Sequence, residues 1–90
     1  MLRRWFVDHE IRHVPLAQFG GQTFDFRLPA FDLLIQVDTH LGPATGRQLR
    51  LHNWQQQFAK RKGLRLLRVH RDDPGIIEKL RQALLSPRPR

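Results

Sequence analysis

TFDFRLPAFDLLIQVD, residues 23–38, decides the fold of this chain, because it has the pattern of two β-strands joined by a short turn. Residues 23–28 and residues 33–38 alternate apolar and polar side chains, and a period of two is typical of half-buried strands. Between them, residues 29–32 read Pro-Ala-Phe-Asp, a composition that favours a turn. The stretch therefore predicts an antiparallel hairpin.

The alternation assigns each side chain of the hairpin to a face. The apolar face is predicted to carry Phe24, Phe26 and Leu28 from the first strand and Leu33, Ile35 and Val37 from the second. The other face carries Asp25, Gln36 and Asp38. Asp is depleted in strands, so two carboxylates at such positions favour a functional role over a merely solvated face.

The turn also fixes the register of the two strands. It pairs Leu28 with Leu33 and, in the same register, places Asp25 opposite Gln36. Opposite residues lie within about 5.5 Å and diagonal neighbours about 7–8 Å apart, and Asp38 is the diagonal neighbour of Asp25. Carboxylate and amide oxygens are ligands that hard divalent cations accept. The hairpin therefore predicts one polar patch that could hold a divalent metal.

Composition points to one small domain. The 90 residues allow a modest core, which we expect to span residues 1–85 and to be followed by a disordered basic tail, residues 86–90. The chain has no cysteine, which excludes disulfides and thiolate zinc sites. No apolar run approaches the roughly 18 residues of a membrane span, and no signal-peptide core follows the N-terminal arginines. These features favour a cytoplasmic protein of a bacterium, phage or archaeon.

The charge balance favours a nucleic-acid partner. Sixteen Lys and Arg against eight Asp and Glu give a net charge of +8, and thirteen of the sixteen are Arg. Arg binds phosphate with two parallel hydrogen bonds, so this excess favours a nucleic acid as the partner. The alternative is that the basic surface serves solubility alone. The candidate phosphate contacts are Arg47, Arg50, Lys60, Arg61 and Lys62.

The rest of the chain supplies further elements around the hairpin. The expected elements are a helix at residues 2–11, an edge strand within residues 12–19, a helix at residues 47–62, a strand at residues 64–69 and a helix opened by Asp73-Pro74. Pro15 indicates the edge strand, and Gly63 is expected to end the second helix as its C′ residue. Leu51, Trp54 and Phe58 form the apolar stripe of the second helix, and Trp54 and Phe58 are expected in the core. The order α-β-β-β-α-β-α predicts an α/β fold, a mixed four-stranded sheet flanked by helices.

Three blocks of the sequence resemble the PD-(D/E)XK, or restriction-endonuclease-like, nuclease superfamily. They are Phe24-Asp25-Phe26-Arg27-Leu28-Pro29, Leu33-Leu34-Ile35-Gln36-Val37-Asp38 and Gly63-Leu64-Arg65-Leu66-Leu67-Arg68-Val69. The likeness is greatest to small members, the very-short-patch-repair endonucleases and short phage and bacterial nuclease-like domains. It spans about residues 11–71, and it implies a restriction-endonuclease-like core.

The resemblance implies hydrolysis of a DNA phosphodiester with Mg²⁺, for which Mn²⁺ can substitute. Asp25 matches the main metal ligand, and Asp38 stands where the family has Lys or, in small members, another acid. Gln36 stands where the family usually has Glu, and it offers a metal only its amide oxygen. Glu10 matches an acid that relatives often carry near the metal. The implied metal ligands are therefore Asp25, Asp38, Gln36 and Glu10.

The resemblance also suggests two histidines as catalytic groups beside Asp25, Gln36 and Asp38. His40 follows the second strand, where the very-short-patch-repair group carries His, and His52 lies in the second helix. A histidine can protonate a leaving group or position a water. Relatives with an acid in place of the strand Lys carry a Lys on this helix with an acid one turn before it. The corresponding positions here are Gln55 and His52, which match neither residue.

Three hypotheses about function follow. The first is a small endonuclease, with a homodimer as its candidate form. It recognises branched or otherwise structured DNA in repair or recombination, since no element for reading base sequence is evident. The second is a catalytically weakened nuclease-like domain that binds DNA or a protein partner without cutting. The third is an unrelated basic α/β module, such as an RNA-binding or inhibitory phage-type protein.

Overall fold

The elements of the chain follow the predicted order of helix, three strands, helix, strand and helix. The structure, a computed structural model, describes residues 2–19, 21–39 and 42–85. Its elements are α1 (Leu2–Asp8), β1 (Val14–Phe19), β2 (Gln22–Leu28), the 3₁₀ turn η1 (Pro29–Phe31), β3 (Leu33–Asp38), α2 (Gly46–Arg61), β4 (Arg65–His70) and α3 (Ile76–Leu85). The predicted α/β fold class is thus confirmed, whereas the predicted tail lies outside the described residues.

The strands form one mixed sheet in the order β1-β2-β3-β4. β1 to β3 are an antiparallel meander, and β3 and β4 are parallel. The predicted register of the hairpin is confirmed, because Leu28 pairs with Leu33. β1 is an edge strand, as Pro15 predicted, since proline cannot donate to a neighbouring strand.

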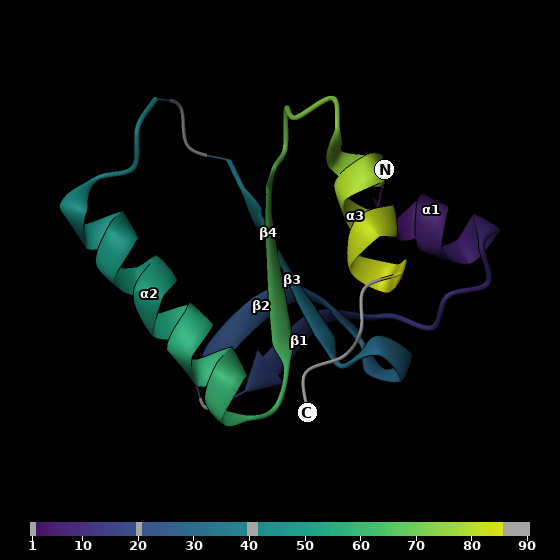
Figure 1. Cartoon of the computed structure of the whole chain (residues 1–90), viewed down its shortest axis with the longest axis horizontal. Helices are drawn as coiled ribbons and strands as arrows, with labels where there is room; N and C mark the ends of the chain where they lie inside the picture. Colours follow the sequence, from purple (N-terminus) through teal and green to yellow (C-terminus); the bar gives the residue numbers. More distant parts are fainter. Residues whose placement is uncertain (1, 20, 40–41, 86–90) are drawn as a thin grey trace.

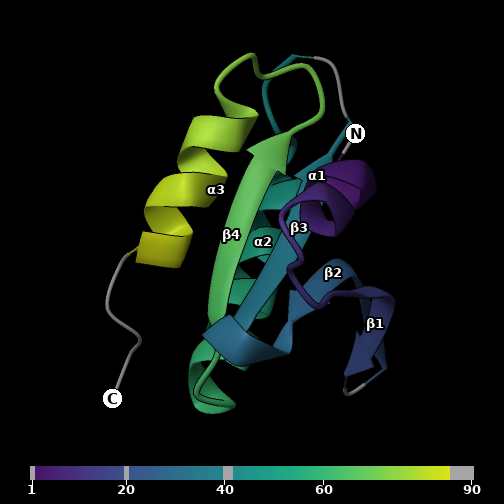
Figure 2. The same ribbon diagram turned by 90° about the vertical axis from the view of Figure 1, so that its right-hand side faces the viewer.

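The sheet separates two layers of helices. Figure 1 shows α2 on one side of the sheet and α1 with α3 on the other, and Figure 2, turned by 90°, shows α2 behind the strands. This arrangement follows from the chain order, because two parallel neighbours such as β3 and β4 need a crossover, here made by α2. None of the helices within the described ranges is long and apolar enough to span a membrane.

Each face of the sheet has its own apolar cluster. The larger cluster, on the side of α1 and α3, is built on the buried residues Leu2, Phe6, Leu28, Leu33, Ile35, Val69, Ile76 and Leu80. The smaller one, under α2, is Phe24, Leu34, Phe58, Ala59 and Leu64. Alternation along β3 and β4 produces this division, since Leu33 and Ile35 face one way and Leu34 faces the other.

Both ends of α2 are capped. The Thr45 side chain accepts a hydrogen bond from the Gln48 backbone N–H, and the Gln48 side chain accepts one from the Thr45 N–H. Such a capping box satisfies two of the free N–H groups at a helix start, and our sequence reading missed it. Gly63 follows the helix with φ of 71°, the left-handed conformation predicted for it.

The first helix is shorter than predicted. α1 ends at Asp8 rather than at residue 11. Glu10 has φ of 55°, and the Ile11 N–H donates to the Phe6 carbonyl at 2.8 Å, which closes the last turn. A left-handed residue cannot continue a right-handed helix, so the chain leaves toward β1 at this point.

The predicted apolar face of β2 is wrong for Phe24. Phe24 is buried under α2, whereas Phe26 and Leu28 pack on the opposite face. The cause lies at Asp25, between the two phenylalanines. Asp25 is paired with no residue of β1 or β3, and Leu16, which lies opposite Asp25 on β1, has φ of 49°. This interruption breaks the alternation and turns Phe24 toward α2.

Two predicted helical details also differ. Phe58 is buried as expected, but Leu51 and Trp54 are exposed, because the buried side of α2 is centred on Gln55, Phe58 and Ala59. α3 starts at Ile76, two residues later than a cap at Asp73 implies. Asp73 still accepts a hydrogen bond from the Gly75 N–H at 2.8 Å.

Candidate functional site

A polar site lies under α2 where β3 and β4 end. The two strands are parallel, so their carboxyl ends meet at one edge of the sheet. On the α2 face, each strand changes from apolar to polar toward this edge, with Leu34 followed by Gln36 and Asp38, and Leu66 followed by Arg68. Gln36 pairs with Arg68 across the ladder, which brings the polar side chains together.

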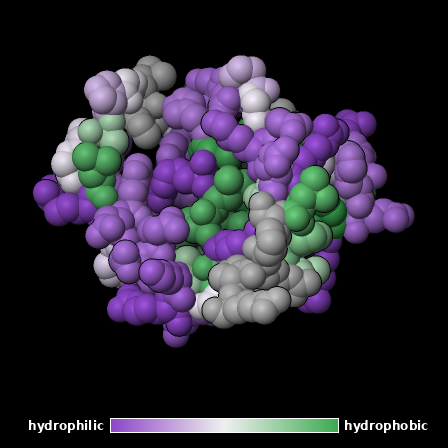
Figure 3. Space-filling view, viewed as in Figure 1, coloured by the Kyte–Doolittle hydropathy of each residue, from purple (hydrophilic) through white to green (hydrophobic). Residues whose placement is uncertain are grey.

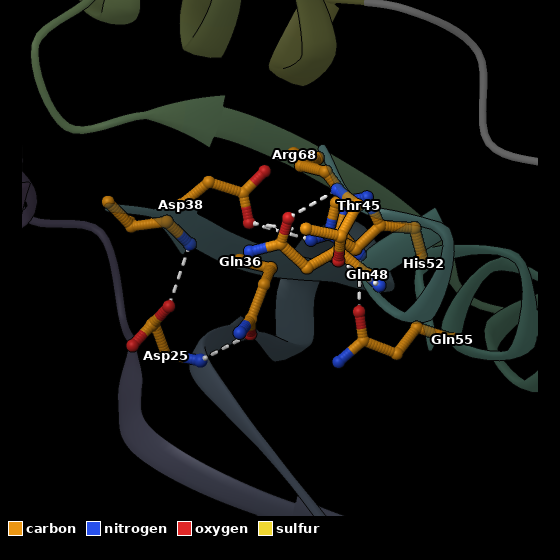
Figure 4. Close-up of polar contacts among 9 residues, drawn as sticks. Asp25, Gln36, Asp38, Thr45, Gln48, His52, Gln55 and Arg68 are labelled. Carbon is orange, nitrogen blue, oxygen red and sulfur yellow. Dashed lines mark hydrogen bonds and ion pairs between the residues drawn. The ribbon is translucent and has the colours of Figure 1, made fainter. Parts of the chain in front are cut away.

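Asp38 is the centre of this site. Its Oδ1 accepts a hydrogen bond from Arg68 Nη1 at 2.8 Å, and His52 Nε2 of α2 lies 3.9 Å from the same oxygen (Figure 4). The side chains of Asp38 and Arg68 are only 15% and 22% exposed. Partial exclusion of water strengthens such a pair relative to ion pairs on an open surface.

Gln55 fixes the other side of the arginine. Its Oε1 accepts a hydrogen bond from Arg68 Nη2, and the residue is 3% exposed. A buried amide needs a partner, and the planar guanidinium supplies one in a set direction. Arg68 is thus held between a carboxylate of β3 and an amide of α2.

A pocket of about 240 Å³ opens onto these groups. It is lined by Gln36, Val37, Asp38, Thr39, Gln48, Leu51, His52, Gln55 and Arg68. Its wall therefore carries donors from Arg68 and acceptors from Asp38, with His52 able to do either. Such a pocket has the chemistry to bind a phosphate group beside a carboxylate.

Asp25 lies next to this pocket without lining it. Its Oδ2 accepts a hydrogen bond from the Val37 N–H at 2.7 Å, and its own N–H donates to Gln36 Oε1 at 3.3 Å. Figure 4 shows the carboxylate directed at the backbone of β3, whereas the Asp38 carboxylate is directed at Arg68. The side chains of Asp25 and Gln36 thus form hydrogen bonds in place of the backbone–backbone hydrogen bonds that are missing between β2 and β3 at this level.

The other predicted site residues are distributed as follows. Gln36, Asp38 and His52 line the pocket, and Gln55 adjoins them. Glu10 is exposed and follows α1, whose buried residues pack on the opposite face of the sheet from α2. His40 lies outside the described residues. Arg47, Arg50, Lys60, Arg61 and Lys62 are exposed along α2 and at its end. The roles assigned to all of these residues stay predictions.

The oxygen ligands of Asp25 and Asp38 fit a hard divalent cation. Each keeps one carboxylate oxygen that accepts no hydrogen bond from the described residues, Oδ1 in Asp25 and Oδ2 in Asp38. Mg²⁺ commonly uses one or two carboxylates and retains several waters. A site in which protein side chains supply most of the ligands is not formed by residues 2–19, 21–39 and 42–85, since no group of three or more His, Asp or Glu converges there.

The fold is similar to that of a known nuclease. A solved structure of the homing endonuclease I-Bth0305I catalytic domain matches 90% of this chain and 82% of its own, with a TM-score of 0.69 and 18% sequence identity. The chain has a nuclease-like fold. At this identity the likeness shows the fold alone, so membership of the PD-(D/E)XK superfamily stays a prediction. No protein-family model and no curated protein matches the sequence.

Sequence reasoning missed Arg68 and Gln55 as members of the site. The signal for Arg68 was present, because it continues the alternation of Leu64 and Leu66 and therefore had to face the same helix as Asp38. Gln55 was located only as a position where relatives carry Lys. Its burial depends on Arg68, so no local pattern reveals it.

Proposed function

We propose that this protein is a small metal-dependent endonuclease that hydrolyses phosphodiester bonds in DNA. The observation that carries the proposal is the pocket at the ends of β3 and β4, where Asp38, His52 and Arg68 meet within a nuclease-like fold. A net charge of +8 supports DNA as the substrate.

Each side chain of the site has a role in this proposal. Asp38 and Asp25 would hold the cation, which lowers the pKa of bound water and stabilises charge on the phosphoryl oxygens. Arg68 binds a non-bridging oxygen of the scissile phosphate, for which its fork of donors is suited. His52 holds or releases a proton at Nε2, on the side of the pocket that faces Asp38.

The basic side chains of α2 bind the flanking phosphates. Arg47, Arg50 and Arg61 are exposed and, at 100° per residue, project from one side of the helix, whereas Lys60 projects from another. Contacts of this kind bind DNA irrespective of sequence and weaken as salt is raised. We therefore propose selectivity for DNA structure rather than for sequence.

Cleavage of supercoiled and branched DNA in Mg²⁺ or Mn²⁺ tests the proposal. Asp38→Asn keeps an acceptor for Arg68 and removes the charge, and we expect a fall in rate of about 100-fold or more. Asp25→Asn keeps the acceptor for Val37 and should act in the same direction. Asp8→Asn, an exposed position on α1, is the matched control and should cut normally. Undiminished cleavage by Asp38→Asn would show that the site is elsewhere.

A second candidate function, DNA binding without cutting, is favoured by the Arg68–Asp38 ion pair. The guanidinium already neutralises the carboxylate that a cation would use, and Gln36 adds no charge. Tight, salt-dependent binding of DNA with no cleavage in either metal would establish this function in place of the first.

A further inference from the structure

Trp54 is an exposed aromatic side chain with a rigid support. Its indole is stacked on the Phe58 ring, with centroids 5.2 Å apart and planes 14° from parallel. Phe58 is in turn stacked on Phe24, 6.2 Å away, and both phenylalanines are buried. Trp54 nevertheless remains 39% exposed. The core thus holds the indole from one side and leaves part of it open to a ligand.

Three arginines flank this tryptophan on the helix surface. Arg50 precedes Trp54 by four residues, Arg47 precedes it by seven and Arg61 follows it by seven, which places all of them on one side of α2. All three are exposed. Aromatic side chains set among cations are typical of sites for single-stranded nucleic acid, where bases stack on rings and phosphates bind the charges.

Charge selects a nucleic acid over a protein as the occupant of this surface. Figure 3 shows that the surface over α2 is hydrophilic apart from a small hydrophobic patch over its N-terminal half. A second copy of the chain would bring the same arginines together and add to a net charge of +8 on each molecule. A polyanion instead supplies phosphates for the arginines and a flat ring for the indole.

The tryptophan is also next to the pocket. Leu51, one turn before Trp54, lines the pocket together with Asp38 and His52. A nucleotide stacked on Trp54 would therefore place its neighbouring phosphates near Arg68. An unpaired base offers its face to a side chain at the lowest cost, because bases within a duplex are stacked on each other and must first be unstacked.

We infer that Trp54 is the residue that selects unpaired DNA, by stacking on an exposed base beside the pocket. The inference rests on the proposed function and gives the structural selectivity of that function a physical origin. Arg47, Arg50 and Arg61 bind the phosphates on either side of the stacked base.

Binding of a labelled single strand and of the matched duplex, measured by fluorescence anisotropy without divalent metal, tests the inference. We expect Trp54→Ala to weaken single-strand binding about tenfold, the effect of losing one stacked base, and to change duplex binding less than about twofold. Trp54→Phe keeps a ring and should retain most of the affinity. Arg61→Gln is the matched control and should weaken both ligands by similar factors.

Several outcomes would overturn the inference. These are an equal loss for both ligands in Trp54→Ala, an unchanged affinity for the single strand, or a change from dimer to monomer in sedimentation, which would make this surface a protein interface. Thermal melting of Trp54→Ala shows whether its loss of affinity reflects unfolding. Single-strand preference without any cleavage would refute the proposed function alone, and cleavage with an unchanged preference in Trp54→Ala would refute the inference alone.

Discussion

The two faces of the sheet use the same strands for different purposes. The face under α1 and α3 is apolar along β3 and along β4 beyond Arg65, and its cluster includes both Leu33 and Val69. The face under α2 is apolar only in its first half and ends in the pocket around Asp38. We infer that the face under α1 and α3, with the larger buried cluster, contributes most of the stability, which leaves the other face free to carry charged groups.

Two arginines of β4 show the same contrast. Arg65 faces α3 and donates to the carbonyls of Ala83 at 2.6 Å and Phe31 at 3.0 Å. Arg68 faces α2 and donates to the side chains of Asp38 and Gln55. The first joins backbone segments and has a structural role, whereas the second lies on the wall of a pocket that a ligand could enter.

Phe6→Ala should have the largest effect on stability. Phe6, on α1, is fully buried in the larger apolar cluster, so the change leaves a cavity. It should cost about 3–5 kcal/mol, a large part of the stability of a small domain. Urea denaturation measures it. Loss of less than about 1 kcal/mol would contradict the assignment of stability to this face.

Replacing each of the two arginines in turn by methionine should have smaller effects on stability than Phe6→Ala. The two variants should differ in whether DNA binding changes. Arg65→Met should cost about 2 kcal/mol, because two carbonyls lose a charged donor, and should leave DNA affinity unchanged. Arg68→Met should weaken DNA binding about tenfold and should also lower stability, because the buried Gln55 amide and the Asp38 carboxylate lose their donor. Chemical denaturation and binding titration of both variants provide the readouts. Similar DNA affinities in the two variants would remove Arg68 from the site.

Asp73→Asn should have the smallest effect, and it depends on pH. The ammonium of Lys79 and the N–H of Gly75 bind the charged form of Asp73 and hold the pKa of its carboxyl below the usual value of 3.8. A lowered pKa stabilises the folded state above pH 3.8, and that stabilisation is lost as the pH falls through the folded pKa. The variant should therefore be slightly less stable than the parent at pH 7.

Thermal melts at pH 7 and near pH 3 give this comparison. The difference between Asp73→Asn and the parent should shrink on acidification. A difference that grows toward low pH would have the wrong sign for a lowered pKa.

Local patterns predicted most of the fold. The turn after Leu28 set the hairpin register, Pro15 placed an edge strand and Gly63 ended the second helix, each through a backbone property of one or two residues. The burial of Phe24 under α2 could not be predicted in this way. It depends on Asp25 and Leu16, which are nine residues apart in sequence and leave the ladder at the same level.

The candidate site was predicted in part for a similar reason. Gln36 and Asp38 follow from alternation along one strand, and His52 was placed on the helix that covers it. The link between them is Arg68, and its partner Gln55 is buried only because the arginine is there. Pairs that stabilise each other across two elements leave no periodic signal in either one.

The hydrogen bond from the Val37 N–H to Asp25 has an evolutionary consequence. A carboxylate that completes a sheet is maintained by selection for shape, independently of the proposed cleavage of DNA. A lineage that lost catalysis would therefore keep Asp25, or replace it with Asn, long after Asp38 had drifted. We expect position 38, rather than position 25, to distinguish active from inactive descendants of this fold.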